Sequence, residues 1–152
     1  MTDVRTLPVA LALAAIIGSA PLLAADSRQD ELRDNTLAAI AGLDERGQKI
    51  AQNYLKDRVA GKPVSCVPRM RLRRSAAASD DVLMYDDGAV VYVNTPYLGC
   101  PRARDNVLIS VSPSAQMCSG DIIQVADVQV GIPLASCTLN QFVPFRKPKT
   151  GG

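Results

Sequence analysis

The chain has 152 residues, of which 17 are Lys or Arg and 15 are Asp or Glu, giving a formal net charge of +2 at pH 7. So small an excess of positive charge does not steer a protein to DNA or to a strongly charged membrane, and we expect no nucleic acid partner. Histidine and tryptophan are both absent. The lack of histidine excludes His-dependent triads, His-ligated zinc or haem, and imidazole acid–base catalysis.

Residues 1–25 have the organisation of an export signal. An apolar run over residues 6–17 follows a short N-terminal region, and small residues stand at Ala24 and Ala25, as in secretory signal peptides. A retained membrane anchor would need about 20 apolar residues, and residues 18–21 (GSAP) end the run earlier. We expect cleavage after Ala24 or Ala25, no transmembrane segment afterwards, and a periplasmic or secreted location in a bacterium.

Four cysteines follow the expected cleavage site. An even number of cysteines in an exported chain predicts two disulfides, and four cysteines allow three pairings. A tetrathiolate zinc site and a redox-active pair are the alternatives, but both commonly use C-x-x-C spacing, which this chain lacks. Each disulfide would stabilise the fold by about 3 to 4 kcal/mol. The cysteines are Cys66, Cys100, Cys118 and Cys137.

Residues 26–59 are expected to be helical. Their apolar side chains recur at three- and four-residue steps, which predicts one amphipathic helix or two. Gly47 favours a break, since glycine weakens a helix interior, and residues 47–59 are the firmer part of the prediction. Such a helix either binds a partner or covers one face or end of a sheet.

From residue 61 onward the apolar period changes from the helical value to two. Arginine alternates with Met and Leu in residues 66–74 (CVPRMRLRR), which predicts a half-buried strand whose outer face carries Arg69, Arg71 and Arg73. The dipeptide Asp87-Gly88 predicts the centre of a tight hairpin turn. The other expected strands are residues 82–86, 89–94, 107–111, 122–128 and 142–145.

These elements predict an α+β fold: an N-terminal amphipathic helix, then an antiparallel sheet of about six strands curled as a small barrel or sandwich. The expected organisation is a signal peptide (1–25), a helical segment (26–59), a disulfide-linked β domain (60–145) and a disordered tail (146–152). Loops 95–106 and 129–136 are expected to be the variable surfaces.

Four phrases carry a resemblance to a known family: VAGKPVSC (59–66), YVN (92–94), MCSGD (117–121) and FVPF (142–145). Over about residues 47–147 the chain resembles an uncharacterised family of small exported proteobacterial proteins, sphingomonad-like ones especially, a family that is a domain of unknown function. The resemblance implies no activity or ligand. It does imply that Cys66 pairs with Cys118, which leaves Cys100 with Cys137; the rival pairing joins Cys66 to Cys137 and Cys100 to Cys118.

The arginine stripe formed by Arg69, Arg71, Arg73 and Arg74 has two interpretations. Guanidinium groups bind phosphate well, so the stripe could hold an anionic envelope ligand such as lipopolysaccharide phosphate or a wall polymer. Charged residues also protect a strand from edge-to-edge aggregation, and carboxylates on the next hairpin could pair with the arginines across the sheet. Those carboxylates are Asp80, Asp81, Asp86 and Asp87.

Other combinations of residues are weaker candidates for a catalytic or metal-binding site. Neighbouring aspartates on a strand point to opposite faces, unlike a glycosidase pair, and they lack the ligand spacing of a calcium loop. A serine nucleophile would need Lys62 or a carboxylate as its base, and no S-x-x-K motif is present. The aromatic residues predict either a pocket or core packing. The residues in question are Ser110, Ser112, Ser114 and Ser119, and Tyr92, Tyr97, Phe142 and Phe145.

The sequence therefore predicts a non-enzymatic binding or envelope-associated module with no catalytic residue, metal or cofactor. Its partner would be an unknown protein or envelope ligand, with Arg69, Arg71 and Arg73 as a possible anion-binding set. The alternative is a small periplasmic hydrolase or transferase that uses carboxylate or Ser-Lys chemistry.

Overall fold

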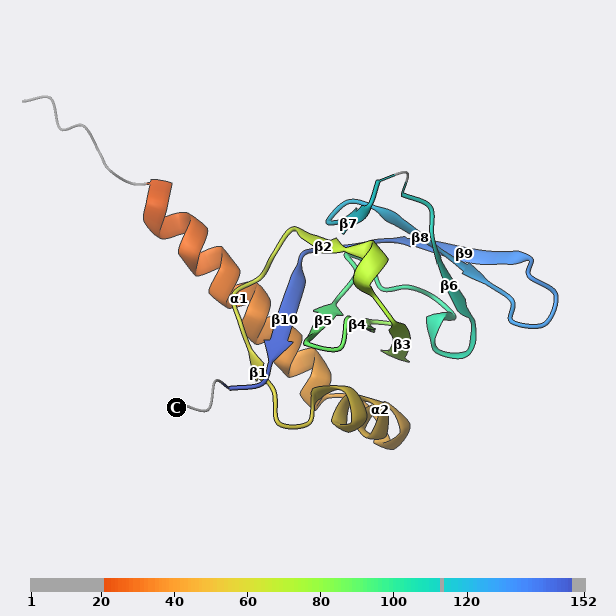
Figure 1. Cartoon of the computed structure of the whole chain (residues 1–152), viewed down its shortest axis with the longest axis horizontal. Helices are drawn as coiled ribbons and strands as arrows, with labels where there is room; N and C mark the ends of the chain where they lie inside the picture. The colour runs from red at the N-terminus through yellow and green to blue at the C-terminus, as the bar shows by residue number, and fades with distance from the viewer. Residues whose placement is uncertain (1–20, 113, 149–152) are drawn as a thin grey trace, which may run out of the picture.

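The computed structural model describes residues 21–112 and 114–148 (Figure 1). This part of the chain has two α-helices and three antiparallel sheets, so the fold is mixed α+β. Residues 1–20 of the expected signal peptide lie outside the described residues, as do residues 149–152 of the expected tail. Arg146, where that tail was predicted to begin, is the last residue of strand β10.

The two helices are α1 (Pro21–Ala41) and α2 (Glu45–Leu55). A break near Gly47 was predicted; it falls slightly earlier, at residues 42–44, and Gly47 itself lies in the first turn of α2. Asp44 is the N-cap of α2, and its carboxylate accepts a hydrogen bond of 2.8 Å from the Gly47 N–H. Gly47 is needed for packing: a Cβ there would lie 2.6 Å from the carbonyl oxygen of Ala78. The first turn of α2 therefore packs directly against the backbone of Ala78.

A five-stranded sheet forms the middle of the protein. Its order is β1 (Val59–Ala60), β10 (Phe142–Arg146), β5 (Val90–Asn94), β4 (Val82–Asp86) and β3 (Arg74–Ser79). Every residue of β4 and β5 is buried, because both faces of the sheet are covered. On one face, Met84 and Val93 of the sheet share a core with helical side chains, among them Ile50 and Ala51 of α2.

Two smaller sheets cover the other face of the five-stranded sheet. One pairs β2 (Cys66–Pro68) with β7 (Gln116–Cys118), and the other has the order β6 (Val107–Ser110), β8 (Ile122–Ala126), β9 (Pro133–Thr138). Their inner side chains, among them Met117, Ile123 and Val125, share one core with Leu83 and Phe142 of the central sheet. The β8–β9 hairpin extends away from this body (Figure 1).

The expected barrel is not formed. The described residues contain no closed barrel, because their strands form three separate sheets that stack. Strands β6 and β9 are the two edges of the three-stranded sheet. Segments without strand pairing, such as residues 95–106, carry the chain from one sheet to the next. The expected loop at 129–136 is also partly wrong, since Pro133 begins β9 and pairs with Ala126.

The predicted single strand over residues 66–74 is only partly correct, because a strand is present at its two ends but not in its middle. β2 ends at Pro68, residues Arg69–Arg71 form a short 3₁₀ helix, and β3 begins only at Arg74. The turn is closed by a hydrogen bond of 3.1 Å from the Leu72 N–H to the Arg69 carbonyl. The alternation of arginine with apolar residues therefore does not place the arginines on one face of a strand.

The β4–β5 hairpin is present, but its turn is one residue later than predicted. The Asp87 N–H donates to the Val90 carbonyl at 3.1 Å, so Gly88 and Ala89 are the central residues. Gly88 has φ +93°, a backbone conformation that favours glycine at the first central position.

Two disulfides, Cys66–Cys118 and Cys100–Cys137, staple the described fold. This is the pairing that the family resemblance implies. Cys66 and Cys118 stand directly opposite each other in β2 and β7. The second disulfide is buried and joins the loop after β5 to β9, so it ties the central sheet to the three-stranded one.

Candidate functional site

Four arginines from two separate stretches of the chain gather at the β4–β5 turn. Arg58, just after α2, donates to the carbonyls of Ala89 at 2.7 Å and Gly88 at 3.1 Å. The Arg73 guanidinium also lies against Gly88, because a Cβ at that glycine would be 3.2 Å from its Nη1. We call this set the arginine cluster; its members are Arg58, Arg71, Arg73 and Arg74.

Within residues 21–112 and 114–148, two aspartates form ion pairs with the arginine cluster. Asp87 lies 3.4 Å from Arg71, and Asp86 pairs with Arg74. Four guanidinium groups and two carboxylates leave a local excess of two positive charges. The sequence analysis expected such cross-sheet pairs for Asp86 and Asp87, and these two pairs account for half of the cluster.

The two aspartates also build the turn. Asp86 accepts the Gly88 N–H at 2.7 Å, and Asp87 accepts the N–H groups of Ala89 and Val90 at 3.0 and 2.7 Å. Burial disfavours the charged form of Asp86, but hydrogen bonds from Arg74 and the Gly88 N–H outweigh burial and lower its pKa. The carboxylates are thus held in place as turn and ion-pair partners.

The arginines of the cluster differ in how firmly they are held. Arg74 also lies 5.0 Å from the centroid of the Tyr54 ring, a cation–π contact. Arg73, by contrast, is exposed, and within residues 21–112 and 114–148 its guanidinium makes no hydrogen bond or ion pair. Arg73 is therefore the member of the cluster that is open to a ligand.

The predicted anion-binding set is only partly brought together. Arg71 and Arg73 belong to the cluster, whereas Arg69 donates to the carbonyl of Ser112 at 2.6 Å and anchors the loop before β7. Arg58 was not predicted as part of the site, because no periodicity links it to the stripe; its approach to the turn depends on the tertiary fold. Asp80 lies elsewhere and accepts the N–H groups of Arg102 and Arg104.

Beside the cluster a small pocket opens between the central sheet and the smaller sheets. Its volume is about 190 Å³. Tyr85 from β4 and Ser110 from β6 line it, and both hydroxyl groups are buried without a hydrogen-bond partner in the described structure. We call it the Tyr85 pocket. Its other lining residues are Arg69, Leu72, Arg73, Arg74, Ser75, Leu108, Met117 and Ile123.

The Tyr85 side chain is deeply set in this pocket. The residue is 4% exposed, and its ring meets the Phe142 ring edge to face at a centroid distance of 6.0 Å. Burial raises the pKa of the Tyr85 hydroxyl, so at neutral pH it is a neutral group that can donate and accept. The four aromatic residues singled out from the sequence do not include Tyr85: Tyr92, Phe142 and Phe145 are buried in the core, and Tyr97 is exposed.

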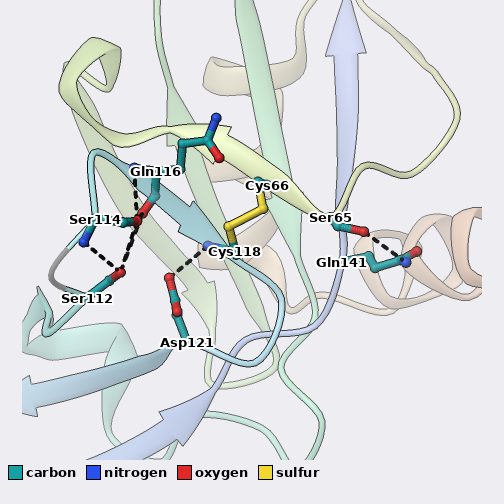
Figure 2. The surroundings of a disulfide bond; sticks show 8 residues. All are labelled: Ser65, Cys66, Ser112, Ser114, Gln116, Cys118, Asp121 and Gln141. Carbon is teal, nitrogen blue, oxygen red and sulfur yellow. Dashed lines mark hydrogen bonds between the residues drawn. A yellow bond between two sulfur atoms is a disulfide. The ribbon is translucent and has the colours of Figure 1, made fainter.

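Two of the serines considered as nucleophiles, Ser112 and Ser114, are engaged in loop structure, whereas Ser110 lies in β6. Figure 2 shows Ser112, Ser114 and Gln116 in a local hydrogen-bond cluster beside the Cys66–Cys118 disulfide, with Ser114 donating to the Gln116 carbonyl at 2.6 Å. Lys62, the proposed base, instead pairs with Asp26 at 2.9 Å. In the part of the chain that the structure describes, no group of three or more Cys, Asp or Glu side chains is placed to hold a metal ion.

A second surface is apolar. Val107, Ile109 and Ile122 lie on the outer face of the three-stranded sheet and are 43 to 49% exposed. The positions paired with them across that face carry Ala126, Gln124 and Thr138, with no charged side chain among them. The tip of the β8–β9 hairpin continues this surface with Val128, Val130 and Ile132.

Among residues 21–112 and 114–148, no helix is long and apolar enough to span a membrane. The resemblance to small exported proteobacterial proteins stays a prediction. Comparison of the chain with protein-family models, with curated proteins and with solved structures gives no match.

Proposed function

We propose that this protein is a non-enzymatic, disulfide-stapled binding domain of the bacterial periplasm, and that its ligand is an anionic group of the cell envelope bound at the arginine cluster. One observation carries the proposal: four guanidinium groups surround a single turn that supplies only two carboxylates. The two disulfides fit an oxidising compartment.

The cluster has the properties that anion binding needs. Guanidinium groups present several N–H donors in a fixed fork that matches phosphate and carboxylate oxygens. Arg71 and Arg74 keep 66 and 62% of their side chains exposed although each pairs with an aspartate. Because Arg58, Arg71 and Arg74 are already held in place, less side-chain entropy is lost when an anion binds.

The alternative is a small hydrolase or transferase that uses carboxylate or Ser-Lys chemistry. A general base must lie within hydrogen-bond reach of the group it deprotonates. The Lys62–Asp26 pair and the engagement of Asp86 and Asp87 in the turn favour the binding role over this alternative.

The test compares two variants of equal net charge on a phosphate-bearing cation exchanger. R71Q/R73Q removes two charges from the cluster, and R28Q/R102Q removes two exposed charges elsewhere. We expect the cluster variant to elute at clearly lower salt than the control variant, since exposed charge pairs act only over about 10 Å at 0.1 M salt. Equal elution of the two variants, with both folded by circular dichroism, would overturn the proposal.

A further inference from the structure

We propose that the Tyr85 pocket binds a small organic acid with an apolar body, whose anionic group meets Arg73 and whose second polar group meets the hydroxyls of Tyr85 and Ser110. This inference deepens the proposed function, because it assigns Arg73 of the arginine cluster to a defined ligand class. It is carried by the pocket and its lining residues.

The first argument is the pair of unpartnered hydroxyls. Tyr85 Oη and Ser110 Oγ are buried without a hydrogen-bond partner in the described residues, and they come from different sheets to line one cavity. Buried polar groups in folded proteins are almost always hydrogen-bonded, and leaving one unpaired is costly. Two such hydroxyls, on residues that line one pocket, are groups whose hydrogen bonds the polar part of a bound ligand would satisfy.

The second argument is the size and lining of the pocket. Leu72, Leu108, Met117 and Ile123 supply apolar walls, which are typical of sites that bury the body of a small molecule. With a volume of about 190 Å³, the pocket suits the body of a small molecule better than a polymer chain or a whole lipid.

The third argument is the charge at the wall. Three arginines line the pocket, but Arg69 is bound to the Ser112 carbonyl and Arg74 to Asp86. Arg73 has no side-chain partner within the described part of the chain. A single open guanidinium beside apolar walls selects one anionic group on an otherwise apolar molecule.

The experiment is an NMR titration of the exported protein with three matched probes, following the backbone amides of Ser75, Tyr85, Ser110 and Ile123. The probes are 4-hydroxybenzoate, benzoate, which lacks the hydroxyl, and 4-hydroxybenzyl alcohol, which lacks the charge. We expect saturable shifts with 4-hydroxybenzoate. Benzoate should bind about 2- to 10-fold more weakly, and the alcohol about 10- to 100-fold more weakly.

Variants with matched controls assign the contacts. Y85F should weaken 4-hydroxybenzoate binding about 2- to 10-fold and R73Q about 10- to 100-fold, whereas Y97F and R102Q should bind as the wild type does. Y85F should also keep or raise the melting temperature of the free protein, because it removes an unpaired buried hydroxyl. S110A gives a second test of the same hydroxyl pair should Y85F not fold.

Two results would overturn the inference: no saturable shift at about 10 mM probe, a concentration that detects dissociation constants in the millimolar range, or binding that Y85F, S110A and R73Q leave unchanged. Either result would mean that the pocket is only a hydrated cavity. The ion-exchange comparison keeps the two proposals distinct, since it uses no small acid. Retention that depends on the cluster without probe binding would leave the proposed function standing and the pocket inference refuted.

Discussion

Strand β5 (VVYVN) of the central sheet and strand β6 (VLIS) of the three-stranded sheet are similarly apolar and β-branched but meet different surroundings. In β4 and β5 all residues are buried, because helices cover one face and smaller sheets the other. In β6 exposed and partly buried residues alternate, since its outer face is uncovered. The comparison shows that the cover on a sheet, more than its own residues, decides which side chains hold the fold and which remain available to a ligand.

The same contrast separates the two surfaces that could recognise another molecule. The arginine cluster sits at the turn between the fully buried strands β4 and β5, so a rigid scaffold holds its charges. The outer face of the three-stranded sheet offers Val107, Ile109 and Ile122, uncharged and exposed. Changes that weaken the cover or the junction between the sheets therefore test the contrast directly.

The largest effect is expected from breaking the junction between the two sheets. C100A/C137A removes the disulfide that ties the loop after β5 to β9 and closes a separation of 37 residues. Restriction of the unfolded chain predicts a loss of about 4 kcal/mol in the free energy of unfolding. Urea unfolding followed by circular dichroism measures it. A loss below about 1 kcal/mol would mean that apolar packing alone holds the junction.

A matched pair of threonine substitutions compares the two sheets themselves. V93T places a hydroxyl at a fully buried position that faces the helices and should cost about 1 to 3 kcal/mol. I109T changes a residue that is 43% exposed and should alter stability by less than about 0.5 kcal/mol. Chemical unfolding of both variants gives the two values. Similar losses would show that the outer face is covered in solution.

Substitution of Gly47 tests the helical cover of the central sheet. Alanine favours a helix over glycine, yet G47A would place a Cβ 2.6 Å from the Ala78 carbonyl, so we expect a loss of about 1 to 3 kcal/mol. At Gly42 the nearest atom to an added Cβ is 3.5 Å away, and G42A should gain up to about 1 kcal/mol. Thermal unfolding of both variants measures the two effects. If both substitutions stabilise the protein, α2 must lie farther from β3 than the structure shows.

The smallest effect concerns the turn below the arginine cluster. Burial of Asp86 opposes its ionisation, but the hydrogen bonds from Arg74 and the Gly88 N–H lower its pKa below the usual 3.8. Ionised Asp86 therefore stabilises the folded state fully above its unfolded-state pKa, and this stabilisation is lost as the pH falls through its lower folded-state pKa. D86N should cost about 1 kcal/mol at pH 7, a value reduced by solvent screening of the exposed Arg74.

The pH dependence supplies the check on that prediction. The difference in unfolding free energy between wild type and D86N should shrink below about pH 4. D81N, which alters an exposed aspartate outside the turn, is the matched control at pH 7 and should cost clearly less than D86N. A wild-type to D86N difference that is independent of pH would contradict the ion pair with Arg74.

Much of the β domain was predictable from the sequence, namely where the residue pattern of a strand matches the burial of its two faces. Residues 107–110 alternate because one face is exposed, and Gly88 marks a turn because glycine tolerates its positive φ. Strand β3 was missed, since RSAAAS has weak strand propensity; its alanines lie where α2 approaches closely.

The candidate site was less predictable because it depends on tertiary contacts. Arg71 and Arg73 were identified from their spacing, although Arg71 ends a 3₁₀ turn and Arg73 lies between that turn and β3, so neither is in a strand. Arg58 reaches the turn from the end of α2, and no local pattern indicates this. Tyr85 reads as an ordinary strand residue in VLMYD; only the packing of two sheets reveals its unpartnered hydroxyl.

The most direct test of the central claim, anion binding at the arginine cluster, is an NMR titration of the exported protein with inositol hexakisphosphate at physiological salt. The account predicts saturable amide shifts concentrated at residues 58, 71–74 and 86–90, with little change at residues 128–132. Shifts centred on residues 128–132, or no saturable shift up to about 1 mM, would contradict it.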